Sequence, residues 1–188
     1  METDVFVGTL GPDGEGHQER FIYGLNGDDN LRGESDLPSQ IYGGKGNDDL
    51  KYLGPSTSKI YGEDGNDVLT GAEHNDVLSG GDGSDLFIFL TSFAPDNVDR
   101  IVDFEPGIDK IVIFGDIAPE LGDGVSKGEF RIGTKAHDKS DHLLYDQKHG
   151  KLYYDADGKG EDGKVLFALL PKHLDLDHND FGVAVLHL

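Results

Sequence analysis

Aspartate recurs in the first half of the chain at a fixed place in a glycine-rich frame, and carboxylates spaced in this way could bind a cation. Segments that begin at Gly24, Gly43, Gly62, Gly71 and Gly80 share the nine-residue pattern G-G-x-G-x-D-x-U-x, in which U is large and apolar. Carboxylate and backbone carbonyl oxygens suit a hard cation. The chain has no cysteine, so thiolate metal sites, cysteine nucleophiles and a disulfide scaffold are excluded. The sixth-position aspartates are Asp29, Asp48, Asp67, Asp76 and Asp85.

The apolar position of this frame defines a regular lattice. Weaker copies of the frame, each one residue longer, lie at residues 33–42 and 52–61. Self-similarity at such a period predicts a stacked repeat architecture. Glycines permit a tight, partly left-handed turn, and a three-residue strand would direct the apolar side chain inward. The apolar positions, nine or ten residues apart, are Leu31, Ile41, Leu50, Ile60, Leu69, Leu78 and Phe87.

Residues 24–88 closely resemble the RTX (hemolysin-type) calcium-binding repeat. The resemblance implies an all-β fold, a parallel β-roll or β-solenoid of nonapeptide repeats, in which six residues turn, three form a strand and two nonapeptides complete one coil. Calcium is then the implied cofactor, and it tolerates an irregular, carbonyl-rich shell better than magnesium does.

A coil of two repeats places alternate turns on opposite edges of the roll. The turns 24–29, 43–48, 62–67 and 80–85 begin 19, 19 and 18 residues apart, and we call the edge that they share the aspartate edge. Each adjacent pair of turns is expected to hold one Ca²⁺ between backbone carbonyls and sixth-position aspartates, which gives about three ions. The candidate metal residues on this edge are Gly24, Asn26, Gly27, Asp29, Gly43, Lys45, Gly46, Asp48, Gly62, Asp64, Gly65, Asp67, Gly80, Asp82, Gly83 and Asp85.

The opposite edge should be largely empty of calcium. Its turns at residues 8–20, 33–39 and 52–58 are degenerate, and Ser39 and Ser58 stand where aspartate is required. Asp76 is the one candidate ligand there, with His74 in place of a glycine. The alternative, that all these aspartates only cap turns, is disfavoured because it would stack like charges with nothing to compensate them.

Composition divides the chain near residue 90 and excludes several partners. The whole chain has 37 acidic and 16 basic side chains, a net charge of −21, which argues against nucleic acid and anionic membrane surfaces. No segment approaches the roughly 18 apolar residues of a membrane span, and the N-terminus lacks the features of a cleaved signal peptide. Residues 1–90 hold 18 acidic and 5 basic residues, a net of −13, and are predicted to form the roll.

Residues 91–188 are predicted to form a β-rich segment that caps the roll. Residues 99–111 are similar to the segment that follows the repeats in serralysin-type proteases, and this resemblance implies a cap. A hairpin is expected over residues 143–155 and a strand over 165–170. The end of the chain, residues 180–186, is similar to the uncleaved signal that type I secretion machinery recognises; an ordinary final strand is the alternative.

Tyrosines 19 residues apart should form a ladder on an outward face of the roll: Tyr23, Tyr42 and Tyr61. Such a ladder could bind polysaccharide, because secreted β-solenoids often meet it. Stacking between neighbouring strands is the simpler interpretation.

Catalytic motifs are weak. Gly124–Gly128 matches G-x-S-x-G, but that motif requires a strand-to-helix elbow. Residues 155–166 fail as an EF-hand, because Lys159 and Leu166 stand at ligand positions; an acidic turn with at most a weak extra calcium site is expected. An enzyme is therefore not expected in this segment.

The sequence as a whole favours a calcium-triggered folding and secretion module of an extracellular RTX protein, with any enzymatic activity in a domain upstream. Two alternatives stay open: a self-contained secreted polysaccharide-binding or adhesion protein, and an enzyme in its own right. The first strand, residues 4–7 with Phe6 at the apolar position, is expected to begin an uncapped first coil, which favours a fragment of a larger protein.

Overall fold

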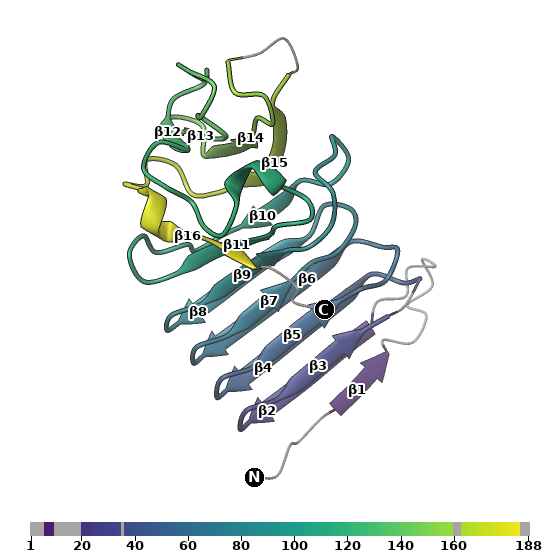
Figure 1. Ribbon diagram of the computed structural model, residues 1–188. Coiled ribbons are helices and arrows are strands. Elements are labelled where there is room, and N and C mark those ends of the chain that lie inside the picture. Colours follow the sequence, from purple (N-terminus) through teal and green to yellow (C-terminus); the bar gives the residue numbers. More distant parts are fainter. Residues whose placement is uncertain (1–5, 10–19, 35, 160–162, 185–188) are drawn as a thin grey trace.

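The computed structural model describes residues 6–9, 20–34, 36–159 and 163–184, and almost all of its regular structure is β (Figure 1). Two sheets lie face to face. The first contains, in spatial order, β1 (Phe6–Thr9), β2 (Arg20–Asn26), β4 (Ser39–Lys45), β6 (Ser58–Asp64), β8 (Val77–Asp82), β10 (Asp99–Ile101), β15 (Val165–Leu169), β14 (Lys151–Tyr154), β13 (Leu143–Asp146) and β12 (Phe130–Ile132). The second contains β16 (Phe181–Ala184), β11 (Lys110–Phe114), β9 (Leu86–Phe89), β7 (Val68–Thr70), β5 (Asp49–Tyr52) and β3 (Asn30–Gly33).

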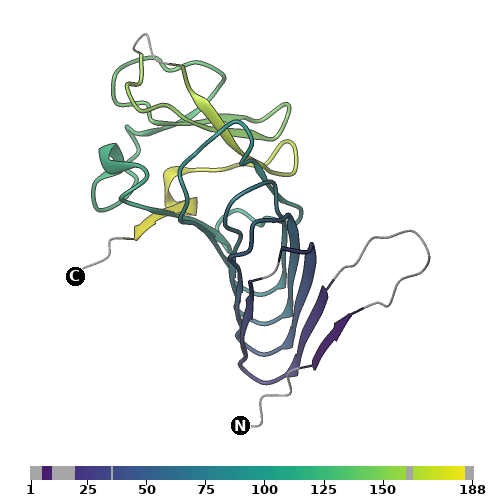
Figure 2. The same ribbon diagram turned by 90° about the vertical axis from the view of Figure 1, so that its right-hand side faces the viewer.

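The repeats form the predicted parallel β-roll. Consecutive strands alternate between the two sheets, and each pairs in parallel with the strand one coil away (Figure 2). The apolar positions are therefore in register, with Ile41 opposite Ile60 in one sheet and Leu50 opposite Leu69 in the other. These four side chains are completely buried, so a single column of apolar residues between the sheets forms the core of the roll.

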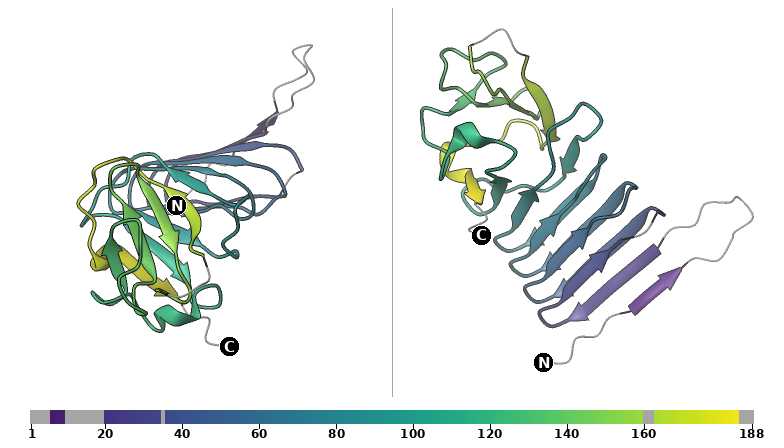
Figure 3. Two further views of the ribbon diagram at one scale, coloured as in Figure 1. Left: turned by 90° about the horizontal axis from the view of Figure 1, so that it is seen from above. Right: turned by 45° about the vertical axis from the view of Figure 1, so that its right-hand side comes forward.

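The first strand departs from the prediction. The expectation that residues 4–7 begin a parallel coil is wrong for its described part, because β1 pairs with β2 in antiparallel fashion, with Phe6 opposite Tyr23. Only residues 10–19 separate the two strands, whereas a parallel crossover through the second sheet needs a dozen or more. β1 therefore lies along the edge of the first sheet (Figure 3). Most of the predicted turn at 8–20 lies outside the described residues.

Both sheets continue past residue 90. β10 pairs in parallel with β8, and β11 with β9, so residues 99–114 add one further coil without a nonapeptide sequence. β16, from the end of the chain, adds a strand beside β11. The expected hairpin is present as β13 and β14, and β15 lies where a strand was expected.

Aromatic side chains join the last coil to the C-terminal strands. The Phe89 ring meets Phe167 edge-on with centroids 5.1 Å apart, and Phe93 lies 4.3 Å from Phe167 and 5.2 Å from Tyr154. One continuous buried cluster consequently runs from the repeats into the C-terminal part. Among the described residues, no helix has the length and apolar character needed to cross a membrane.

Candidate metal site

The aspartate edge is a column of four buried carboxylates. Each sixth-position aspartate directly precedes a strand of the second sheet, and Asp29, Asp48, Asp67 and Asp85 are all at most 3 % exposed. One oxygen of each carboxylate binds the neighbouring coil: the backbone N–H of Asp29 donates to Oδ1 of Asp48 (2.8 Å), that of Asp48 to Asp67 (2.8 Å), and that of Asp67 to Asp85 (2.9 Å). Successive turns are therefore held in register by the carboxylates themselves.

The second carboxylate oxygen has a different environment. Within the described residues, Oδ2 of Asp48, Asp67 and Asp85 is buried and has no hydrogen-bond partner. A buried, unsatisfied oxygen of a charged group costs more than the roughly 1–3 kcal/mol of a neutral one. This pattern indicates that a group that is not part of the protein, such as a cation, completes the site.

Backbone carbonyls face the same gaps between turns. A Cβ added to Gly62 would overlap both Oδ2 of Asp67 and the carbonyl oxygen of Gly80, which belongs to the next turn. The two oxygens therefore lie on the same side of Gly62, in the gap between turns 62–67 and 80–85. Gly43 has the equivalent neighbours, Oδ2 of Asp48 and the carbonyl of Gly62.

Fourth-position carbonyls point into the gaps from the other side. The carbonyl oxygens of Gly27, Gly46 and Gly65 approach the fourth-position glycine of the following turn so closely that only glycine fits there. Their partners Gly46, Gly65 and Gly83 have φ between +131° and +141°, which is a second reason for glycine. Each gap is therefore lined by carbonyls from two turns and by one carboxylate oxygen, a donor set that fits Ca²⁺.

The third positions serve the backbone. The carbonyls of Lys45, Asp64 and Asp82 accept hydrogen bonds of 2.6, 2.8 and 2.8 Å from the fourth-position amide of the preceding turn. The Lys45 ammonium lies 3.5 Å from the Asp64 carboxylate at the surface. Asn26, at the same position in the first turn, is exposed.

Burial raises the pKa of these carboxyls because it disfavours the charged form. The pKa of Asp67 rises to about 7 and that of Asp85 to about 6, mainly through desolvation and in part through neighbouring carboxylates. The pKa of Asp48 is raised for the same reasons. No three His, Cys, Asp or Glu side chains within the described part of the chain are grouped so as to hold a metal ion.

The opposite edge has one comparable carboxylate. Asp76 is 1 % exposed; its Oδ1 accepts hydrogen bonds from the backbone N–H and the hydroxyl of Ser58, at 2.6 and 2.8 Å. Its Oδ2 has no hydrogen-bond partner among the described residues. Its own N–H donates to Oδ1 of Asp99 (2.9 Å). Burial raises the pKa of Asp76 to about 6 and that of Asp99 to about 8.

Sequence reasoning missed that the aspartate column continues beyond the repeats. The N–H of Asp85 donates to Oδ1 of Asp109 (3.0 Å), in the same geometry as within the repeats. The run Asp109-Lys110-Ile111 preserves the D-x-U part of the frame and is the feature that could have revealed it. Asp99, at the start of β10, lies in the run Asp99-Arg100-Ile101, which preserves the same D-x-U part.

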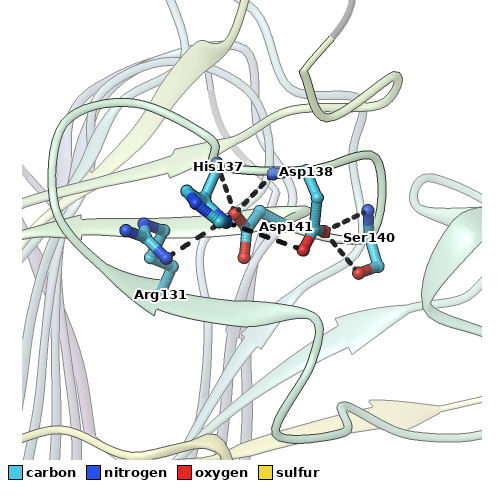
Figure 4. Close-up of polar contacts among 5 residues, drawn as sticks. All are labelled: Arg131, His137, Asp138, Ser140 and Asp141. Carbon is cyan, nitrogen blue, oxygen red and sulfur yellow. Dashed lines mark hydrogen bonds and ion pairs between the residues drawn. The ribbon is translucent and has the colours of Figure 1, made fainter.

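The polar residues of the C-terminal part stabilise turns. Oδ2 of Asp141 accepts the N–H groups of His137 and Asp138, and the N–H and hydroxyl of Ser140 donate to Oδ1 of Asp138 (Figure 4). The Arg131 guanidinium lies 4.0 Å from Asp141. These contacts close the loop before β13.

The G-x-S-x-G segment has no elbow. Its Ser126 N–H donates to the Glu129 carboxylate (2.6 Å) in a turn that leads into strand β12, and the motif's context for catalysis is not met.

A parallel roll whose stacked glycine–aspartate turns enclose oxygen-lined gaps belongs to the class of calcium-binding β-rolls. The sequence model of the RTX calcium-binding nonapeptide repeat matches in four copies, over residues 21–36, 39–51 and 57–87. This part of the chain therefore belongs to the RTX repeat family, and calcium is its cofactor.

One similar solved structure is the solution structure of the AlgE6R3 subunit from the Azotobacter vinelandii mannuronan C5-epimerase. It has 25 % sequence identity and a TM-score of 0.37, and the match covers 84 % of this chain and 79 % of that one. The TM-score is too low to carry an argument. No curated protein matches the chain significantly.

Proposed function

We propose that this chain is a calcium-dependent folding and secretion module of an extracellular RTX protein, and that it binds one Ca²⁺ in each of the three gaps between the four repeat turns. The observation that carries the proposal is that an aspartate Oδ2 lies beside a carbonyl oxygen of the next turn in each of the three gaps, for Asp29, Asp48 and Asp67, and that Oδ2 of Asp48 and of Asp67 is buried with no hydrogen-bond partner within the described residues. The candidate ligands on this edge are the first- and fourth-position carbonyls and the sixth-position carboxylates.

Calcium would supply the positive charge that the folded roll lacks. Residues 1–90 have a net charge of −13 and contain 17 of the 28 glycines, so charge repulsion and backbone entropy both oppose folding. Three Ca²⁺ would offset six of those charges. Because the gaps exist only when the turns are stacked, the free energy of ion binding becomes folding free energy.

The same coupling suits export. Extracellular calcium modules work at roughly 10⁻⁴–10⁻³ M, a concentration that the cytosol does not provide, so the chain would stay unfolded until it leaves the cell. The C-terminus would then have two roles in succession, first as a secretion signal and later as a strand of the folded roll. Residues 180–186 would act as a type I secretion signal in the unfolded chain. Their described part would then become strand β16 beside β11 once calcium folds the roll.

We further propose that any enzymatic activity lies in another domain of a larger protein. Circular dichroism with millimolar Ca²⁺, and again after full chelation, tests the proposal. We expect a β-rich spectrum only with calcium, and Mg²⁺ at the same concentration should not replace it. A β-rich spectrum that survives chelation at neutral pH would refute the proposal.

The tyrosine face supports a second candidate function, polysaccharide binding or adhesion. The predicted ladder is present: Tyr23 and Tyr42 stack with centroids 5.0 Å apart, and Tyr42 and Tyr61 at 4.8 Å, with interplanar angles of 11° and 14°. However, rings that stack on one another present their edges, and not their faces, to the outside. A sugar ring binds best to an open aromatic face, so this geometry favours strand stabilisation. Glycan-array binding that is lost in Tyr42→Ala would favour the second candidate instead.

A further inference from the structure

We propose that a fourth Ca²⁺ binds between the last repeat turn, 80–85, and the non-repeat turn that follows it in the stack, residues 102–109. The inference rests on the proposed function, because it extends the same column of sites by one gap. One wall of this site comes from residues outside the nonapeptide repeats, because the match to the repeat model ends at residue 87.

The Asp85 carboxylate is oriented like those of the earlier repeat turns, with one oxygen left unpartnered within the described residues. In the repeats, the unpartnered Oδ2 of each aspartate faces the gap that follows its turn, as Asp67 shows by lying beside the carbonyl of Gly80. Oδ2 of Asp85 lies beside Gly80, the first glycine of its own turn, as Oδ2 of Asp67 lies beside Gly62. Asp85 is completely buried, and its Oδ2 has no partner in the described part of the chain. If only the three gaps between repeats held ions, this oxygen would be left without any positive neighbour.

Turn 102–109 supplies the opposite wall. Asp109 takes the sixth-position place in the column, as its Oδ1 accepts the Asp85 N–H. Asp103 lies over the start of turn 80–85: its Oδ1 accepts the Gly80 N–H (3.0 Å), and its Oδ2 accepts the Gly81 N–H (3.1 Å) and the Ser79 hydroxyl (2.6 Å). A second carboxylate therefore borders turn 80–85 on the side of turn 102–109.

The column of unpartnered carboxylate oxygens ends at Asp85 within the described residues. Oδ2 of Asp109 accepts the backbone N–H of Glu105 (2.8 Å). One coil further, Asp180 accepts the N–H groups of Gly107 and Asp177, both at 2.7 Å, on its two oxygens. The protein itself thus satisfies every carboxylate of the column after Asp85. The requirement for an ion ends at the gap between turns 80–85 and 102–109, and not one gap earlier.

Calcium stoichiometry by native mass spectrometry tests the proposal. The variant is Asp103→Asn, which removes the charge and keeps one of the two side-chain oxygens that accept the Gly80 and Gly81 amides. The matched control is Asp123→Asn, at an exposed aspartate outside the column. We expect the Asp103→Asn chain to bind one ion fewer than the wild-type chain, and the control to bind the same number, whatever the opposite edge holds.

A crystal structure of the unaltered chain grown with Ca²⁺ keeps the test independent of whether the variant folds. Density for an ion beside Oδ2 of Asp85, on the side of Asp103, would support the fourth site. Ions only in the three gaps between repeat turns, or an unchanged stoichiometry in a folded Asp103→Asn chain, would overturn it and leave the proposed function intact. A wild-type chain that binds no calcium would instead refute the proposed function.

Discussion

Replacing Gly62 by alanine should remove one calcium site and push the adjacent turn 80–85 away from turn 62–67. Gly62 has no positive φ, so alanine adds no backbone strain there. The added methyl would overlap Oδ2 of Asp67 and the carbonyl oxygen of Gly80, which are the two oxygens expected to face the ion. The substitution therefore fills the gap between turns 62–67 and 80–85.

The size of the effect follows from linkage. A site with free calcium at ten times its Kd contributes about 1.4 kcal/mol to folding, so three such sites contribute about 4.2 kcal/mol. If only two sites remain, each must contribute about 2.1 kcal/mol, which requires calcium at roughly 34 times Kd. The calcium concentration at the midpoint of folding should thus rise about three- to four-fold with three sites, and about two- to three-fold when the proposed fourth site contributes equally.

The assay is a calcium titration of the β-rich circular dichroism spectrum, fitted for midpoint and steepness. Gly163→Ala is the matched control, because a Cβ at Gly163 would have no heavy atom within 4 Å; its midpoint should not change. The titration should also become less steep in Gly62→Ala, since fewer ions are taken up. An unchanged midpoint in Gly62→Ala, or an equal shift in the control, would show that this gap does not hold an ion.

Three further predictions follow from the described geometry. Leu25 is 48 % exposed and has a φ of +75°, so Leu25→Gly should relieve up to about 1 kcal/mol of strain and lower the calcium midpoint, whereas Leu25→Ala should not. The folded, calcium-free state raises the pKa of Asp67 to about 7 from an unfolded value near 4, so it binds a proton more tightly than the unfolded chain. Its stability should therefore increase as the pH falls from 7 towards 4, seen as a gain of β signal without calcium, and Asp67→Asn should flatten this pH dependence. Tyr42→Ala removes two ring stacks and should cost about 1–3 kcal/mol in urea unfolding with calcium present, while a Tyr42→Phe chain as unstable as Tyr42→Ala would contradict the stacking argument.

Much of the roll could be predicted because its contacts repeat with the sequence. A lattice of apolar residues nine or ten apart determines which residues meet between coils, and the tyrosine ladder follows from the same spacing of 19 residues. The C-terminal cap has no such period. The positions of Asp99 and Asp103 depend on where β10 joins the first sheet, which is a contact with β8 and β15 that no local pattern encodes.

The strand direction of β1 shows the same limit at the other end. Its short apolar run is compatible with a parallel or an antiparallel neighbour, and only the short connection to β2 decides between them. Periodicity describes which face of a strand is apolar, but not which strand lies beside it.

The sequence by itself therefore determined the β-roll, the identity of calcium as its cofactor and the column of sixth-position aspartates, because each depends on spacing within one repeat. Only the tertiary structure decided which carboxylate oxygens lack a partner and where the column ends. Those properties depend on which backbone N–H groups reach each carboxylate, and for Asp85, Asp109 and Asp180 the groups come from residues 3 to 73 positions away in the chain.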